Sequence, residues 1–240
     1  MSVFQIFRAV FLLIIAFPLT IVVSMLALID ITLVRKDVEK AHIFPRVWGR
    51  LFCFIVGVTV IVEGLDAIQK GKTYIFAANH ASQFDIFAFQ GYFPHSFRWI
   101  AKKELFRIPV FGQTMRKVGY IAIDRSKGRQ ALKSLDEAAR QIAAGKSVLI
   151  FPEGTRTADG KLQEFKAGAI LLAIKAGVPV VPIAFVNSYQ ILPKGKFLAR
   201  KGTIIIRVGT PMATDHYKAK DKQVLAKELY QQVRSLLETS

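Results

Sequence analysis

An uncharged apolar run near the amino terminus places the strongest single constraint on how this 240-residue chain can fold. From Ala9 to Ile29 the sequence reads AVFLLIIAFPLTIVVSMLALI, about the 20 residues that a bilayer-spanning helix requires. Pro18 divides the run, so two geometries stay open: one true span, or a kinked helix pair lying in one leaflet. The run is longer than a typical signal-peptide core, and no clear cleavage site follows it. We expect residues 1–57 to form a membrane-anchoring helical segment.

Charge and cysteine content indicate where the rest of the chain works. Arg35 and Lys36 follow the apolar run and begin a basic, aromatic linker that reaches Arg50. Basic residues on this side place the remainder on the cytoplasmic face of the inner (plasma) membrane. Lys plus Arg is 34 against 17 Asp plus Glu, a net charge of +17, so we expect an anionic partner. The single Cys53 excludes a disulfide within the chain and favours a reducing compartment.

Strand-like and helix-like segments alternate after the second apolar run, Leu51 to Val62, which is too short to span and ends in a β-branched first strand. We expect residues 58–240 to form one α/β catalytic domain with a mixed central sheet flanked by helices. Further strands are expected at 73–78, 97–101, 119–123, 147–151, 178–185 and 203–208. Helices are expected at 83–92, 110–118, 130–144, 164–176 and 222–237.

The segment from Thr73 to Asp85, TYIFAANHASQFD, is the first candidate for chemistry. A short apolar strand ends at His80, and Ser82 with Asp85 has the pattern of a helix start. Two side chains five positions apart on one helix would point about 140° away from each other, so His80 and Asp85 can meet only if His80 precedes the helix. The carboxylate would then orient the imidazole as a general base. The alternative is a capping box beside a partly buried histidine.

Three further segments deliver polar side chains to strand ends. Phe-Pro-Glu-Gly-Thr-Arg follows the strand at 147–150, where ligands bind in an α/β sheet, and its arginine matches phosphate geometry. The alternative is a tight turn held by a glutamate–arginine ion pair. Asp124 and Arg125 end another strand, while Pro182 inside Val-Val-Pro-Ile-Ala suggests an edge or bulge position. Lys102 and Lys166 are candidates for either a site or a solvated face, and Lys103 is expected on a solvated face.

Taken together and in this order, the four segments resemble those of the glycerolipid acyltransferase family. They are Asn-His-x4-Asp, Gly-x-Ile-x-Ile-Asp-Arg, Phe-Pro-Glu-Gly-Thr-Arg and Val-Pro-Ile. Within the family the chain most resembles the bacterial 1-acyl-sn-glycerol-3-phosphate acyltransferases over about residues 60–208, and the apolar amino terminus agrees with the family's membrane-binding helices. The four motifs show no departure beyond ordinary variability between His80 and Asp85.

The resemblance implies roles residue by residue. His80 would remove the proton from the free hydroxyl of lysophosphatidic acid, and Asp85 would orient it. The resulting alkoxide would attack an acyl thioester, and we expect the oxyanion donors among backbone amides near the His80 turn. The acceptor's glycerol phosphate would be held by Arg125, Glu153, Gly154, Thr155 and Arg156. Lys102 is a further candidate for substrate binding. We expect no metal and no cofactor other than the co-substrate, an acyl carrier protein or coenzyme A thioester.

Other classes of protein are less consistent with the sequence. No zinc pattern or ribonucleoprotein motif supports a nucleic-acid partner, and the apolar amino terminus favours an anionic membrane lipid instead. Neither Gly-x-Ser-x-Gly nor a Walker loop is present. Two alternatives stay open: an acyltransferase for another lysolipid, such as a lyso-ornithine lipid, and a non-enzymatic basic membrane-binding protein. The sequence leaves the acyl chain length and the oligomeric state undetermined.

Overall fold

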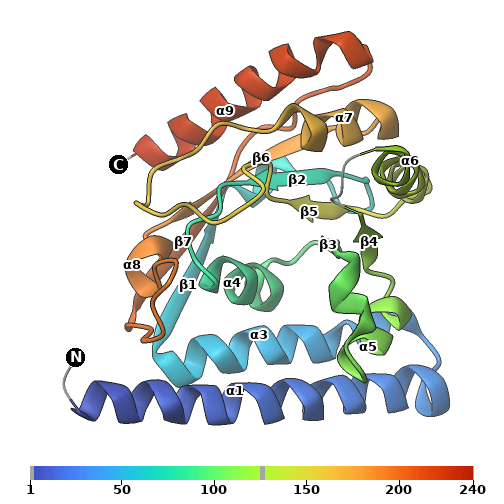
Figure 1. Ribbon diagram of the computed structural model, residues 1–240. Helices are drawn as coiled ribbons and strands as arrows, with labels where there is room; N and C mark the ends of the chain where they lie inside the picture. The colour runs from blue at the N-terminus through green and yellow to red at the C-terminus, as the bar shows by residue number, and fades with distance from the viewer. Residues whose placement is uncertain (1–2, 125–127, 240) are drawn as a thin grey trace.

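A computed structural model describes residues 3–124 and 128–239 of the chain (Figure 1). Within these residues a single seven-stranded sheet alternates with helices, which confirms the expected α/β class and its mixed sheet. The strands are β1 Val58–Glu63, β2 Ile75–Ala78, β3 Arg98–Lys102, β4 Ile121–Ile123, β5 Val148–Ile150, β6 Val180–Val186 and β7 Gly202–Val208. Each expected strand is present, with ends that differ by up to two residues.

The helices include the five expected after the first strand and several shorter ones. The α-helices are α1 Val3–Ile29, α2 Val38–Ala41, α3 Ile43–Val56, α4 Phe84–Tyr92, α5 Phe111–Lys117, α6 Arg129–Ala143, α7 Ala167–Ala176, α8 Ser188–Ile191 and α9 Lys222–Glu238. A π-helical turn, η1 Asp30–Val34, extends α1, and short 3-10 helices lie at η2 Leu65–Ala67, η3 Lys103–Arg107 and η4 Ala219–Asp221.

The strand order explains how residues distant in sequence reach one edge of the sheet. Across the sheet the order is β1, β7, β6, β2, β5, β3, β4. The strands β6, β2, β5, β3 and β4 are all parallel, whereas β7 is antiparallel to β6 and parallel to β1. The carboxyl ends of β2, β3, β4 and β5 therefore meet at one edge, where ligands bind in α/β folds. The segments that carry the sequence motifs follow these strands.

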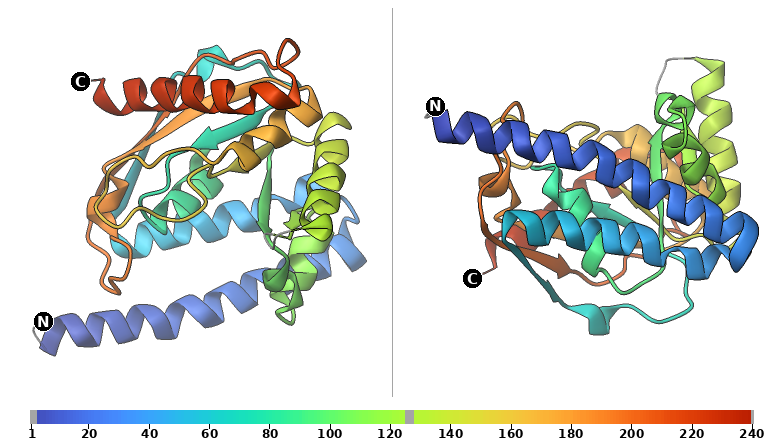
Figure 2. Two further views of the ribbon diagram at one scale, coloured as in Figure 1. Left: turned by 45° about the horizontal axis from the view of Figure 1, so that its top comes forward. Right: turned by 90° about the horizontal axis from the view of Figure 1, so that it is seen from below.

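Two helical layers cover the sheet, as Figures 1 and 2 show. Side chains that alternate along β2 contact both layers. Ile75 and Ala77 pack with α6, α7 and α9, while Phe76 and Ala78 pack with α3 and α4. All four of these side chains are fully buried. A strand that is buried on both faces needs a continuous apolar run, which is what the sequence shows here.

The amino-terminal apolar run forms one continuous helix, because α1 passes through Pro18 without ending. The expected division at that proline is therefore wrong; a proline costs the helix one backbone hydrogen bond without forcing it to stop. Residues Ile14–Val34, with a mean hydropathy of 2.4, are long and apolar enough to cross a membrane. The helix also packs along the domain: Trp48 Nε1 donates to Thr20 Oγ1 at 3.0 Å, and Thr114 Oγ1 donates to Ser24 O at 3.0 Å.

The segment expected as a basic linker is mostly the helix α3, which packs closely on α4. A Cβ atom at Gly49 would lie 2.6 Å from Phe87 O, so the two helix backbones touch there. Two arginines of α3 bind the end of α4: Arg46 Nη2 donates to Phe93 O, and Arg50 Nε donates to Gly91 O at 2.8 Å. Cations at the carboxyl end of a helix satisfy its free carbonyls and its dipole. These contacts fix α4, whose first turn carries Asp85.

Pro182 lies in the centre of the sheet, so the edge position is excluded and the bulge is what the structure shows. Ile183 pairs with Val208, and Val180 forms an isolated bridge with Met212. Three steps along β6 are therefore matched by four steps along the facing segment, which leaves one extra residue between Gly209, which faces Pro182, and Met212. A proline, which has no N–H to donate, is tolerated at such a position.

Candidate active site

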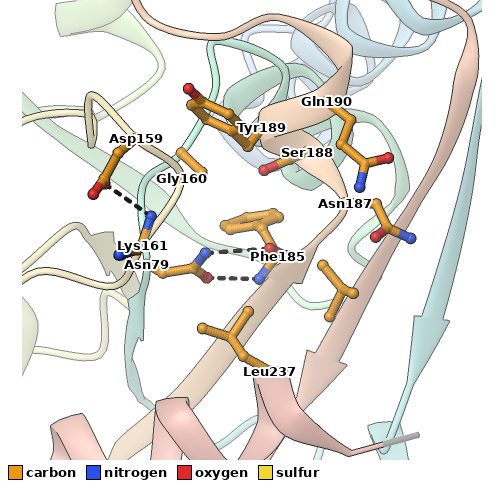
Figure 3. A pocket seen from close by; sticks show the side chains of 12 residues that line it. Asn79, Asp159, Gly160, Lys161, Phe185, Asn187, Ser188, Tyr189, Gln190 and Leu237 are labelled. Atoms are coloured by element: carbon orange, nitrogen blue, oxygen red, sulfur yellow. Dashed lines mark hydrogen bonds between the residues drawn. The ribbon is translucent and has the colours of Figure 1, made fainter.

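The side chain of Asn79 locks the end of β2 to β6. Regular pairing of these strands stops at Ala78 and Ile183. One residue later, Asn79 Nδ2 donates to Phe185 O at 3.2 Å, and Phe185 N donates to Asn79 Oδ1 at 2.7 Å (Figure 3). The amide group thus continues the strand ladder where the backbone turns away. The chain leaves the sheet at a fixed point, and the next residue is His80.

His80 and Asp85 form the expected hydrogen-bonded pair. His80 Nδ1 lies 2.8 Å from Asp85 Oδ2, the Asp85 side chain is fully buried, and the imidazole is 13% exposed. Its Nε2 makes no hydrogen bond to any residue that the structure describes. This arrangement confirms the predicted geometry, with the histidine before the helix and the aspartate in its first turn. An imidazole held at Nδ1 by a carboxylate presents Nε2 as a base.

Asp85 also takes part in capping α4, so the His80–Asp85 hydrogen bond and the capping contacts are present together. Its Oδ2 accepts from Ala81 N and Ser82 N at 2.8 Å each, in addition to His80 Nδ1. Ser82 Oγ in turn accepts from Phe84 N at 3.1 Å. Asp85 Oδ1 has no partner among the described residues, although it is buried. One oxygen with three N–H donors is held firmly, and that oxygen sets the orientation of the histidine.

The segment after β5 surrounds His80 on three sides. The Phe151 ring is stacked on the imidazole with a centroid separation of 3.8 Å and an interplanar angle of 12°. His80 N donates to Glu153 Oε1 at 2.6 Å, and Thr157 N donates to His80 O at 2.9 Å. The ring face, the amide and the carbonyl of the histidine are therefore all held by residues 151–157. Neither Phe151 nor Thr157 was a candidate from sequence, although Phe151 begins the motif.

Glu153 is a buried brace in this arrangement. Only 2% of the residue is exposed, and its second oxygen, Oε2, accepts from Gln163 N at 3.3 Å. Burial raises the pKa of Glu153 from 4.5 to about 7; the hydrogen bonds from His80 N and Gln163 N oppose the shift, and the nearby Asp85 charge adds to it. Both carboxylate oxygens are occupied by backbone donors. The expected ion pair between Glu153 and Arg156 is absent from the described residues.

The expectation for the oxyanion donors is wrong for the amides beside His80. The N–H groups of His80, Ala81 and Ser82 all donate to carboxylates, two to Asp85 and one to Glu153. These amides hold His80 and Asp85 in place, so they are not free to stabilise a developing charge. The sequence shows which residues surround the turn, but it does not show which way each amide points.

Cationic side chains gather on the Gly154–Arg156 turn. Gly154 adopts a left-handed φ of +78°, and a Cβ there would lie 2.8 Å from Lys166 Nζ. Lys194 Nζ donates to Thr155 Oγ1 at 3.2 Å. Arg156 is half-buried, and its guanidinium forms no ion pair or hydrogen bond within the described ranges. The sequence leaves undecided whether Lys166 belongs to a site or to a solvated face. It does not identify Lys194, which lies far along the chain.

The remaining predicted cations belong to the two outer strands. Lys102 ends β3 and is exposed; β3 is two strands from β2, so Lys102 lies roughly 10 Å along the same edge. Lys103, expected on a solvated face, instead pairs with Asp124 at 2.5 Å. That ion pair joins the segments after β3 and β4. Arg125 lies outside the described residues.

A cavity of about 350 Å³ opens beside the His80 turn (Figure 3). His80 does not line it, but its two neighbours in the chain do. The lining residues come from β2, the loop after β5, the end of β6 with α8, and α9: Asn79, Ala81, Asp159, Gly160, Lys161, Phe185, Val186, Asn187, Ser188, Tyr189, Gln190 and Leu237. Ser188 Oγ is buried there without a hydrogen-bond partner among the described residues.

Comparison with known proteins agrees with this geometry. The family model described as Acyltransferase matches residues 59–186, which contain the His80–Asp85 pair and the 151–157 segment. A solved structure titled 1-acyl-sn-glycerophosphate (LPA) acyltransferase, from Thermotoga maritima, superposes with a TM-score of 0.82 at 28% identity. The superposition covers 98% of this chain and 95% of the Thermotoga chain.

Two curated relatives carry the name 1-acyl-sn-glycerol-3-phosphate acyltransferase. The protein from Cocos nucifera is 32% identical over 83% of this chain, and the protein from Pseudomonas aeruginosa is 36% identical over 66% of it. The chain spans 64% and 61% of the length of these two relatives. The family model covers more than half of the chain, and the identity to the coconut protein extends over most of it. The chain belongs to the acyltransferase family.

Proposed function

We propose that this protein transfers a fatty acyl group from an acyl thioester to the free sn-2 hydroxyl of lysophosphatidic acid, which yields phosphatidic acid. The observation that carries the proposal is the His80–Asp85 pair, in which Nδ1 is held by a buried carboxylate and Nε2 makes no hydrogen bond to a described residue. The coconut and Pseudomonas relatives are named for this acceptor, which supports the proposed acceptor and, through it, the product.

The chemistry follows from the two ring nitrogens. His80 Nε2 takes the proton of the acceptor hydroxyl while Asp85 stabilises the imidazolium that forms. The hydroxyl oxygen bonds to the thioester carbon, and the tetrahedral intermediate collapses as the C–S bond breaks. The thiolate leaves and takes the proton back from His80. The mechanism uses no metal and no covalent enzyme intermediate, and the stacked Phe151 ring keeps the imidazole in one orientation during both proton transfers.

The acceptor's phosphate is assigned to the cations at the turn. The backbone at Gly154 allows close approach, and Thr155 offers a hydroxyl beside Lys194. Arg156 offers a planar fork of donors that has no partner among residues 3–124 and 128–239. Lys102 and Arg125 are proposed to extend the site along the strand edge. For Glu153 the contacts support a different role from the one the resemblance implies. Both of its oxygens accept backbone N–H groups, so it shapes the turn that presents Arg156.

The acyl donor is proposed to be a coenzyme A or acyl carrier protein thioester. Both are anionic, and the net charge of +17 suits either. A second candidate function, transfer to another lysolipid such as a lyso-ornithine lipid, uses the same base but has no need of a phosphate site. Arg156, half-buried and without a partner in the part of the chain that the structure describes, favours the phosphate-bearing acceptor. A non-enzymatic membrane-binding protein would have no use for the oriented His80 base.

The protein is proposed to sit on the cytoplasmic face of the inner membrane, anchored by residues 1–57, with residues 58–240 as the catalytic domain. Large apolar side chains of this segment are exposed, Phe17 in α1 by 70% and Leu33 in η1 by 73%. Thr20 and Ser24, in the middle of the apolar helix, bond to α3 and α5. Because α1 is held along the domain by these bonds, we propose that it lies within one leaflet and does not span the bilayer.

The test measures transfer from labelled oleoyl-coenzyme A, and separately from oleoyl carrier protein, to lysophosphatidic acid by the detergent-purified protein. The His80→Ala variant is the control. We expect phosphatidic acid with the wild type and none with the variant, while vesicle binding stays unchanged because α1 is intact. Transfer to a different lysolipid alone would overturn the acceptor. Silence with every acceptor and both donors would support the binding-protein alternative.

A further inference from the structure

A basic loop with an exposed phenylalanine connects α8 to β7. We call residues 193–201, sequence PKGKFLARK, the basic loop; it carries four cations and no acidic residue. Phe197 is 72% exposed, and Lys196, Arg200 and Lys201 form no ion pair within the part of the chain that the structure describes. An exposed aromatic side chain among unpaired cations is typical of a surface that meets an anionic lipid interface.

The basic loop is attached to the candidate active site at its beginning. Ser82 Oγ, in the His80 turn, donates to Leu192 O at 3.0 Å, directly before the loop. Lys194 Nζ, inside the loop, donates to Thr155 Oγ1 at 3.2 Å. A surface that contacts the basic loop therefore lies close to both the His80 turn and the Gly154–Arg156 turn.

The end of the basic loop adjoins the amino-terminal helices. Gly202 N donates to Gly57 O at 3.3 Å, and a Cβ at Gly57 would lie 3.4 Å from Lys201 Cβ. Gly57 ends α3, and Phe54 in the last turn of that helix is 80% exposed. In Figures 1 and 2 the loop between α8 and β7 extends toward α1, on the side of the sheet opposite α9. The exposed apolar surface of the helices thus continues into the loop.

We propose that the basic loop is a second contact with an anionic bilayer, separate from α1, which holds the lipid interface at the acceptor side of the active site. The proposal rests on the proposed function, because it supplies the route by which a lysophospholipid head group passes from the interface to Thr155 and Arg156. Phe197 enters the interface, and Lys196, Arg200 and Lys201 contact lipid phosphates. Lys194 connects this surface to the site.

The loop's contribution to binding can be stated as fold-changes in vesicle partitioning. Burying a phenylalanine side chain changes partitioning by about 30-fold, and each cation near an anionic surface changes it by about fivefold. Phe197→Ser and Lys196→Glu should each weaken partitioning into phosphatidylglycerol vesicles by a factor in this range. In vesicles of phosphatidylcholine alone, Lys196→Glu should have little effect. Lys227→Glu, a charge reversal at another exposed lysine, on α9, should leave partitioning unchanged in both kinds of vesicle.

The direct test places a fluorophore on the loop. Cys53 is fully buried and burial raises its pKa to about 12, so a thiol-reactive dye will label an introduced cysteine selectively. Phe197→Cys and the control Val224→Cys, 52% exposed on α9, are labelled with a polarity-sensitive dye in the full-length protein. On binding phosphatidylglycerol vesicles, the dye at 197 should shift to the blue, and the dye at 224 should not.

Two results would overturn the proposal. One is an unchanged spectrum at 197 in protein that has sedimented with the vesicles. The other is a shift at 197 that appears with acyl carrier protein but not with lipid, which would make the loop a protein docking site. The fluorescence does not depend on turnover, so it separates failure of this proposal from failure of the proposed function. If both hold, Lys196→Glu should slow transfer to vesicle-embedded lysophosphatidic acid and spare a water-soluble short-chain acceptor.

Discussion

Replacing Glu153 by glutamine tests whether this carboxyl is a buried brace or a ligand for the acceptor. Its two oxygens accept from His80 N and Gln163 N, and it is almost completely buried. Glutamine has the same shape and keeps one oxygen for His80 N. Its amide nitrogen carries no charge, so the variant removes the cost of ionising a buried carboxylate. The free energy of unfolding should reveal this through its dependence on pH.

The magnitude follows from the pKa shift. The pKa of Glu153 is raised from 4.5 to about 7, chiefly by burial. Between these two pH values the folded state therefore keeps a proton that the unfolded state has lost. The contribution of this group to the free energy of unfolding is complete below pH 4.5, where both states carry the proton. That stability is lost as pH rises through 7, because the folded protein must then carry the buried charge. For a single group with these two pKa values, the loss between pH 5 and pH 8 is about 2.5 kcal/mol, which glutamine should abolish.

The assay is urea unfolding of wild type and Glu153→Gln in detergent at pH 5, 6, 7 and 8, followed by the fluorescence of Trp48 and Trp99. The two proteins should be within about 1 kcal/mol of each other at pH 5, and the variant should gain about 2.5 kcal/mol relative to wild type by pH 8. Parallel curves would refute the reasoning, because they would mean that Glu153 titrates alike in both states. Steady-state kinetics provides the control: a brace affects kcat, whereas a direct ligand of the acceptor affects the acceptor's KM.

Substitutions at three further residues test the site. Asp85→Asn should lower kcat by about 10⁴-fold with little change in the acceptor's KM, because the imidazole loses its orienting carboxylate; a wild-type rate would contradict the oriented-base mechanism. Arg156→Lys should raise the KM for lysophosphatidic acid by about tenfold, since the bidentate fork is lost, and an unchanged KM would make Arg156 structural. Phe151→Leu should lower kcat while Phe151→Tyr retains it, because only an aromatic ring can stack on His80; equal rates for the two variants would exclude the stacking role.

Local patterns predicted the parts of this structure in which neighbours in sequence interact. The strand that ends two residues before His80, and the helix that begins two residues after Ser82 with Asp85 in its first turn, depend on spacing within a few residues. The alternation of strands and helices depends on short-range periodicity in the same way. These features therefore followed from the sequence without knowledge of the strand order.

Features that depend on contacts between distant segments were not predictable in this way. The first half of α3 lies in the predicted basic linker, and its close packing on α4 depends on the contact between Gly49 and Phe87, which are far apart in the sequence. The role of Lys194 depends on a loop that returns to Thr155 from 39 positions away in the chain. The direction of the amides beside His80 depends on Asp85 and Glu153 together. In each example the deciding atom belongs to a segment that the local pattern does not include.

The Phe-Pro-Glu-Gly-Thr-Arg segment has two tasks that require different chemistry, and its order separates them. Its first half holds the histidine, through the Phe151 ring and the Glu153 carboxylate, and both groups are oriented inward. Gly154 then turns the chain through a left-handed conformation, after which Thr155 is exposed and Arg156 is half-buried without a partner among the described residues. A side chain at the turn would meet Lys166 and carry backbone strain. Gly154→Ala should therefore disturb both halves together, lowering kcat and raising the acceptor's KM, whereas a glycine that merely ends a loop would affect neither.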